Sequence, residues 1–180
     1  SSAAQWLSLS DLDFVLAPSE VHEINYTLDV PSDAPAGTYW TAIFFESNAP
    51  GQGEGQGIGV ETRVRVGHIV YAHVGEVTRS GEIQGFRYQE PVDEPSSVRV
   101  SFSNTGNGLV RVEGHVELRS ETGELVETAN IADTATFPGY TREVPAYLSE
   151  PLEPGRYLTL AVLDYGEAQV IAGEGWIDVP

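Results

Sequence analysis

Two similar stretches decide the fold of this chain: DAPAGTYWTAIFF at residues 33–45 and LEPGRYLTLAVLD at residues 152–164. In each stretch, proline and glycine precede one further residue, a tyrosine and then a hydrophobic run. Gly37 and Gly155 indicate turns, because glycine adopts backbone angles that other residues disfavour. Tyr39 and Tyr157 then enter a strand. The repeat predicts two domains that turn the same structural corner.

Alternation of apolar and polar residues dominates the rest of the chain. The apolar positions of residues 24–30 recur at every second residue, and residues 98–103 and 110–119 repeat this period. Such alternation is typical of antiparallel sheets with one buried face and one wet face. No helical stripe of ten or more residues occurs. We therefore predict an all-β chain.

The number of strand-like runs predicts the architecture. Residues 76–180 contain seven runs, at roughly 77–89, 97–104, 109–120, 124–131, 135–148, 156–165 and 168–179. Seven short strands in about 105 residues is the count of an immunoglobulin-like sandwich, in which a tyrosine near the start of the penultimate strand bonds back to upstream backbone. Tyr39 and Tyr157 fit that place. We predict two immunoglobulin-like antiparallel β-sandwich domains in tandem, residues 1–75 and residues 76–180.

The N-terminal domain has fewer runs than the C-terminal one. They are expected at 6–10, 13–17, 21–30, 38–47 and 59–74. Three runs precede the first tyrosine corner, whereas five precede the second within its domain. We expect the N-terminal domain to lack one or two strands, or to receive them from a partner.

Composition excludes several functions. The chain carries 27 acidic and nine basic residues, a net charge of −18, which repels nucleic acid and anionic lipid. All nine basic residues are arginine, so Schiff-base chemistry on lysine is excluded. Cysteine is absent, which removes disulfides and thiolate chemistry. No apolar run is long enough for membrane insertion. The acidity fits a salt-adapted surface, ordinary solubility or a cation-binding surface.

The candidate reactive groups favour structural readings. His22, His68, His73 and His115 lack the spacing of a metal site. Asp11 and Asp13 are expected in a surface turn, with a calcium pair as the alternative. The stretch 49–59 is expected to be a hairpin loop, because five of its eleven residues are glycine. The alternative, a phosphate-binding loop, is disfavoured because no lysine, serine or threonine ends the stretch. We expect no catalytic residues, no metal, no cofactor and no enzyme activity.

Large apolar residues are expected in the two cores. In the N-terminal domain they are Trp6, Tyr26, Tyr39, Trp40 and Phe44, and in the C-terminal domain Phe102, Val112, Tyr157, Leu160 and Trp176. Neighbours on a strand face opposite sides, so either Tyr39 or Trp40 must face away from the core. Trp40 is the candidate exposed aromatic, and in that place it could stack on a sugar.

The order of features in residues 6–47 resembles a known family. A strand is followed by Leu-Ala-Pro-Ser-Glu at a turn, an alternating strand, Val-Pro, and then Pro-Ala-Gly-Thr-Tyr at the start of another strand. This order resembles the immunoglobulin-like domains of the periplasmic pilus-chaperone superfamily and related bacterial surface domains. In that family an arginine and a lysine hold the carboxylate of a client subunit. This chain has no lysine, so that anchor is not carried over intact.

These observations lead to an expected function. We expect a non-catalytic exported protein with a structural, adhesive or assembly role. It is expected to act through contacts with a protein partner or by self-assembly, with edge-strand pairing as one way to form them. One alternative is a pilus-chaperone-like protein or fibre subunit that uses β-strand donation. Another is a carbohydrate-binding accessory module. The resemblance implies a periplasmic or cell-surface location.

Overall fold

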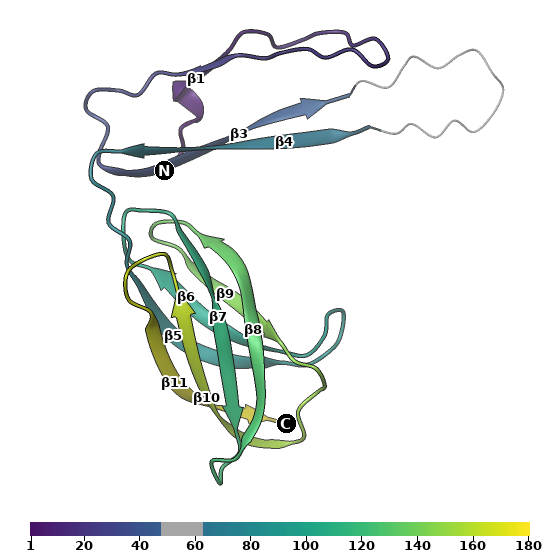
Figure 1. Ribbon diagram of the computed structural model, residues 1–180, viewed down its shortest axis with the longest axis vertical. Helices are drawn as coiled ribbons and strands as arrows, with labels where there is room; N and C mark the ends of the chain where they lie inside the picture. Colours follow the sequence, from purple (N-terminus) through teal and green to yellow (C-terminus); the bar gives the residue numbers. More distant parts are fainter. Residues whose placement is uncertain (48–62) are drawn as a thin grey trace, which may run out of the picture. The chain divides into compact units, whose positions relative to one another are not determined.

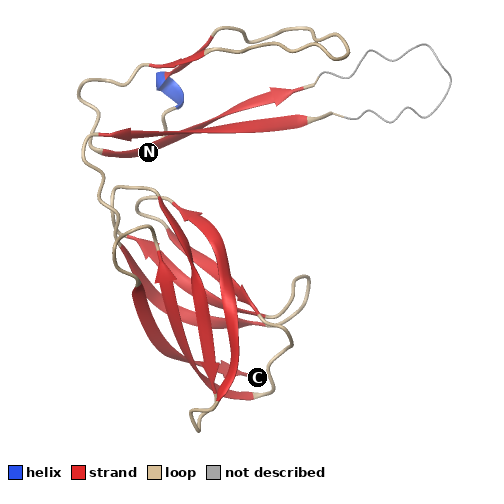
Figure 2. Cartoon of the chain, viewed as in Figure 1, coloured by secondary structure: helices blue, strands red, loops and turns tan. Residues whose placement is uncertain are grey.

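The computed structural model describes residues 1–47 and 63–180, and their regular structure is β-strand apart from one 3₁₀ turn, η1 (Ala4–Trp6) (Figures 1 and 2). Stretch 49–59 lies outside the described residues. The chain divides into two compact units. Unit 1 comprises Ser1–Pro35 and Tyr39–Val74, and unit 2 comprises Ala36–Thr38 and Gly75–Pro180.

Unit 2 contains one antiparallel sheet of seven strands in the order β11-β10-β7-β8-β9-β6-β5. The strands are β5 (Gly81–Gln89), β6 (Ser97–Asn104), β7 (Val110–Arg119), β8 (Leu125–Thr136), β9 (Thr141–Tyr147), β10 (Gly155–Asp164) and β11 (Ile171–Val179). Strands β8 and β9 share a single residue pair, Ile131 with Ala146. The sheet therefore folds at that point into two layers, β11-β10-β7-β8 and β9-β6-β5, which together form a sandwich or nearly closed barrel.

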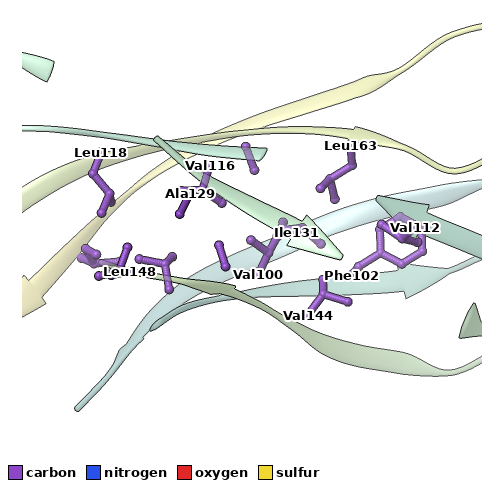
Figure 3. Packing of buried hydrophobic residues seen from close by; sticks show 14 of the residues in the cluster. Val100, Phe102, Val112, Val116, Leu118, Ala129, Ile131, Val144, Leu148 and Leu163 are labelled. Carbon is purple, nitrogen blue, oxygen red and sulfur yellow. The ribbon is translucent and has the colours of Figure 1, made fainter. Parts of the chain in front are cut away.

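The core of unit 2 lies between these layers. Alternate residues of β6, β7 and β10 point inward and are fully buried, because period-two alternation places one face of each strand against the other layer. Figure 3 shows Phe102 and Val112 beside each other, with Leu118 and Leu148 farther along the same core. The predicted core positions Phe102 and Val112 are buried as expected.

A loop rich in asparagine and glycine closes one end of the core. The side-chain amide of buried Asn104 donates hydrogen bonds to the carbonyl oxygens of Gly108 (2.8 Å) and Thr136 (2.9 Å). Asn107 donates to the carbonyl oxygens of Ala36 and Glu76, both at 3.2 Å. These bonds fix the loop, and they fix the short segment 36–38 that belongs to unit 2.

Unit 1 contains four strands in two separate two-stranded sheets. Strands β1 (Leu7–Leu9) and β2 (Tyr26–Leu28) form an antiparallel pair, and β3 (Gly37–Glu46) pairs with β4 (Arg65–Val74). Strand β3 begins within unit 2 and continues in unit 1 from Tyr39. The chain between β1 and β2 is extended and turns at Pro18 and Ser19, with Ser19 at a φ of 67° (Figure 2).

Unit 1 buries little of its apolar surface. Its described residues include four buried apolar residues, Ala3, Tyr39, Ile43 and Val70. Thirteen of its large apolar side chains are exposed. In unit 2, sixteen apolar residues are buried and seven large ones are exposed. Among the described residues of unit 1, most large apolar side chains are therefore exposed, whereas in unit 2 most are buried.

Several sequence predictions are wrong in detail. Tyr26, Phe44 and Trp176 were expected in a core, but all three are substantially exposed. Phe44 and Trp176 lie on the outer faces of their strands, whereas Tyr26 points toward the open side of unit 1. The predicted strand at 13–17 does not form, because this segment is extended without a ladder partner. A predicted break between residues 131 and 135 is also wrong, since β8 runs through it.

Candidate functional site

Each of the two corner motifs contains the same kind of hydrogen bond, from the tyrosine hydroxyl to an upstream carbonyl oxygen. The hydroxyl of Tyr39 donates to the carbonyl oxygen of Pro35, and that of Tyr157 donates to the carbonyl oxygen of Glu153, both at 2.9 Å and both four residues upstream. Gly37 has a φ of 149° and Gly155 a φ of 159°. These residues bring no reactive groups together, so their geometry is that of a structural corner.

Trp40 lies on the face of β3 opposite Tyr39. It is half-buried, whereas Tyr39 is 7% exposed and its ring centroid lies 4.3 Å from that of Trp6. Phe44 shares the face of Trp40 and is 56% exposed, with the Arg65 guanidinium 4.1 Å from its ring centroid. The outer face of the β3-β4 ribbon therefore carries aromatic side chains and one cation.

An open apolar groove lies on the inner face of unit 1. Its volume is about 480 Å³, and its lining residues are Phe14, Leu16, His22, Ile24, Tyr26, Ile43, Phe45 and His68. They come from the segment before β2, from β2 and from both strands of the β3-β4 ribbon. The groove is thus the space between the two small sheets of unit 1.

Two of the four histidines line this groove. The His22 ring stacks on Phe14 with centroids 4.6 Å apart, and its Nε2 lies 3.6 Å from an oxygen of Asp11. The His68 ring lies 6.1 Å from that of Tyr26. Across residues 1–47 and 63–180, no group of three or more histidine, aspartate or glutamate side chains is arranged to hold a metal ion. The histidines serve as aromatic surface of the groove.

Beyond Trp40, the edge of β3 that faces away from β4 has no strand partner among the described residues. The Trp40 amide donates to the carbonyl oxygen of Ser1, and the Ala3 amide donates to that of Trp40, so the backbone of Trp40 faces this edge. Backbone groups alternate along a strand, so those of Ala42 and Phe44 face the same edge. Within the described part of unit 1, the isolated bridge from Ser2 to Trp40 is the sole strand-like contact there.

The nine arginines are engaged within the chain. Six of them form ion pairs with carboxylates within unit 2. The shortest are Arg111 with Asp133 at 2.6 Å and Arg87 with Glu143 at 2.7 Å. The bond from Arg87 holds the pKa of Glu143 below its ordinary value. Residues 1–74 contain nine carboxylates and only two arginines. Arg63 pairs with Glu46, and Arg65 lies over the ring of Phe44. Unit 1 therefore presents an excess of negative charge.

The groove was not predicted from the sequence, although the residue pattern of β3 indicates an apolar surface that needs cover. In residues 39–45 both alternating faces are apolar or aromatic, where a single buried face would leave the other polar. A strand that is apolar on both faces needs cover on both faces.

The described residues contain no helix long and apolar enough to cross a membrane.

Comparison with known proteins gives no relative. No family model matches the sequence, and no curated protein or solved structure is significantly similar to it. The functional assignment rests on the geometry of the groove and of the β3 edge.

Proposed function

We propose that this chain is a non-catalytic assembly module made of two immunoglobulin-like domains, the first of which is completed by β-structure from a protein partner. The observation that carries this proposal is that, among the described residues of unit 1, strand β3 contributes both to an open apolar groove and to an edge without a strand partner beyond Trp40. Exposed apolar patches and unpaired strand edges are typical of surfaces that bind other chains.

Strand order supports an immunoglobulin-like assignment for unit 2. Three strands, β9-β6-β5, pack against four, β11-β10-β7-β8, in an antiparallel Greek-key arrangement like that of immunoglobulin and fibronectin type III domains. The tyrosine corner at the start of β10 is a further feature of such domains. For unit 1, the support is its own tyrosine corner at the start of β3.

The resemblance to pilus-chaperone-like domains supports a periplasmic or cell-surface location. Proteins of that kind act through main-chain pairing between strands of different chains. Such pairing needs no cofactor and no reactive side chain. We therefore assign the chain a binding role in which strand pairing supplies affinity and the groove supplies specificity.

Site-specific photocrosslinking in the cells that make the protein tests this function. A photoreactive phenylalanine analogue replaces Phe45 in the groove, and in a matched control it replaces Tyr140, an aromatic residue of unit 2 that is 61% exposed. We expect one protein adduct from position 45 and none from position 140. The purified adduct partner is expected to raise the unfolding temperature of the chain, because a ligand that binds the folded state stabilises it.

The opposite result is equally clear. The absence of an adduct at Phe45, or the same adducts at Phe45 and Tyr140, would contradict a partner-binding role for unit 1. A partner that crosslinks but leaves the unfolding temperature unchanged would contradict completion of the fold by that partner.

A further inference from the structure

The chain contains its own template for the missing part of unit 1. We propose that the free edge of β3 accepts one β-strand of a separate, basic polypeptide, antiparallel to β3 and in the register that β7 has with β10. This inference rests on the proposed function, and it names the edge, the direction and the chemistry of the incoming strand.

A constant offset relates the two units. The distance from Gly37 to Gly155 is 118 residues, and it places β3 on β10 with the tyrosine corners aligned. The same offset places β2 within β9 and the start of β1 on the start of β8. Strands β1, β2 and β3 thus correspond to β8, β9 and β10. Within the described residues of unit 1, nothing corresponds to β7.

Strand β7 shows what the edge of β10 requires. It pairs antiparallel with β10 from Leu158 opposite Arg119 to Asp164 opposite Glu113. Its inward residues help to bury the inner face of β10, where Thr159, Ala161 and Leu163 are all 0% exposed. One strand therefore satisfies the backbone edge and closes the core at the same time.

The corresponding face of β3 is only partly covered. Thr41, Ile43 and Phe45 take the places of Thr159, Ala161 and Leu163. Ile43 is buried by the rest of unit 1, whereas Phe45 is 36% exposed and lines the groove. The loss of cover increases toward the end of β3 that lies beyond the bridge to Ser2. The uncovered length, residues 41–46, lies within the part of the strand that β7 covers in unit 2.

The register predicts the side chains of the incoming strand. In unit 2, Leu118 lies opposite Thr159, Val116 opposite Ala161 and Gly114 opposite Leu163. The incoming strand is therefore expected to place apolar residues opposite Thr41 and Ile43. Opposite Phe45 it needs a small residue, because phenylalanine fills more of the space than leucine does.

Charge predicts the residues between these apolar positions. The nine carboxylates and two arginines of residues 1–74 create a negative field, and both arginines already have partners within the chain. A strand with lysine or arginine at its alternate, outward positions relieves this field, whereas an acidic strand is repelled. The partner is thus an extended segment that alternates apolar and basic residues.

The other edge of the ribbon is not the acceptor in this scheme. Strand β4 follows β3 as β11 follows β10, and β11 lies at the end of its sheet with one neighbouring strand. By analogy with β11, the outer edge of β4 is expected to be the end of its sheet and not the acceptor. Ile69 reports on that edge, because the Val64 carbonyl accepts from Ser47 and the backbone direction alternates from there.

Binding of a synthetic peptide to the full chain tests the proposal. The probe alternates lysine with leucine or valine over the six register positions opposite residues 41–46, with glycine opposite Phe45, because the edge of Trp40 is already bonded to Ser1 and Ala3. The control peptide has the same composition with its apolar residues in one block. We expect the probe to bind at least about tenfold more tightly than the control peptide, because strand addition requires alternation.

A pair of proline variants locates the edge. Ala42→Pro removes an N–H from the free edge of β3, and Ile69→Pro removes one from the outer edge of β4. Proline is tolerated on an edge strand, so both variants are expected to fold. Ala42→Pro should weaken probe binding about tenfold or more, and Ile69→Pro should leave it unchanged within about twofold.

Hydrogen exchange on the unmodified chain gives a second readout that does not depend on folding of a variant. The probe should slow exchange of the Ala42 and Phe44 amides and leave that of Ile69 unchanged. Slowing at Ile69 with none at Ala42, or loss of binding only in Ile69→Pro, would overturn the edge assignment and leave the proposed function standing. Equal binding of probe and control peptide, or no protection anywhere in unit 1, would overturn both.

Discussion

The tyrosine corners give a prediction whose size follows from the structure. Changing Tyr157 to Phe removes one hydroxyl, and with it the 2.9 Å hydrogen bond to the Glu153 carbonyl. A neutral hydrogen bond contributes about 0.5–1.5 kcal/mol net to the free energy of unfolding. This bond is accessible to water, which can replace the lost donor. We therefore expect Tyr157→Phe to cost unit 2 about 0.5–1 kcal/mol, or roughly 3–6 °C in unfolding temperature.

The same change at Tyr39 should cost more. Tyr39 is 7% exposed, and its bond to the Pro35 carbonyl is partly buried, so water replaces the lost donor less well. A buried acceptor left without a donor costs about 1–3 kcal/mol. Tyr39→Phe is therefore expected to destabilise unit 1 by more than Tyr157→Phe destabilises unit 2.

Tryptophan fluorescence separates the two units. The chain has three tryptophans, Trp6 and Trp40 in unit 1 and Trp176 in unit 2. With Trp6 and Trp40 replaced by phenylalanine, Trp176 reports urea unfolding of unit 2 alone. Tyr140→Phe is the matched control, because that side chain is 61% exposed and its hydroxyl has no hydrogen bond among the described residues. Equal unfolding midpoints for Tyr157→Phe and Tyr140→Phe would refute a stabilising corner bond.

Three further changes test unit 2. Phe102→Ala leaves a cavity at a fully buried site and should cost about 3–5 kcal/mol in urea unfolding, whereas Phe102→Leu should cost much less. Gly114→Ala brings a methyl group onto the Val162 carbonyl and should cost about 2 kcal/mol or more, with Gly85→Ala, where nothing lies within 4 Å and φ is not positive, as a control for added side-chain bulk. Arg87 holds the pKa of Glu143 in the folded chain below its value in the unfolded chain. This interaction stabilises the fold at pH values above the unfolded pKa, and the contribution is lost as the pH falls through the lowered folded pKa. Glu143→Gln should therefore flatten the acid side of the plot of stability against pH.

Strict alternation made the centre of unit 2 predictable. The runs expected at 97–104 and 109–120 match β6 and β7 within a residue, because each strand is buried on one face only. The boundary after β8 was missed, although Pro138 and Gly139 form a turn there, with Gly139 at a φ of 76° and the Tyr140 amide bonded to the Phe137 carbonyl. Alternation alone does not mark a turn, and here the Pro138-Gly139 pair is the stronger signal for the strand boundary.

Unit 1 was less predictable because its strands depend on partners far away in sequence. Residues 21–30 alternate well, but only Tyr26–Leu28 form a ladder, with Leu7–Leu9. A strand exists only where another backbone satisfies its edge, and the local pattern does not show whether that backbone is present. The apolar pattern of residues 39–45 indicates a need for cover, but the groove itself depends on what lies opposite Ile43 and Phe45, which the local pattern does not show.

The two copies of the opening stretch differ in their surroundings rather than in their own geometry. The tyrosine bonds are the same length, and both strands continue as apolar runs. Leu163 is fully buried and Phe45 is not, because β7 pairs with one edge of β10 and no described strand occupies the corresponding edge of β3. Unit 1 exposes thirteen large apolar side chains in all, and a strand that covers those on the inner face of β3 gains free energy by removing them from water. The local sequence determines the geometry of the tyrosine corner in each unit. Whether the apolar face of the strand that follows is buried depends on the strand that pairs beside it.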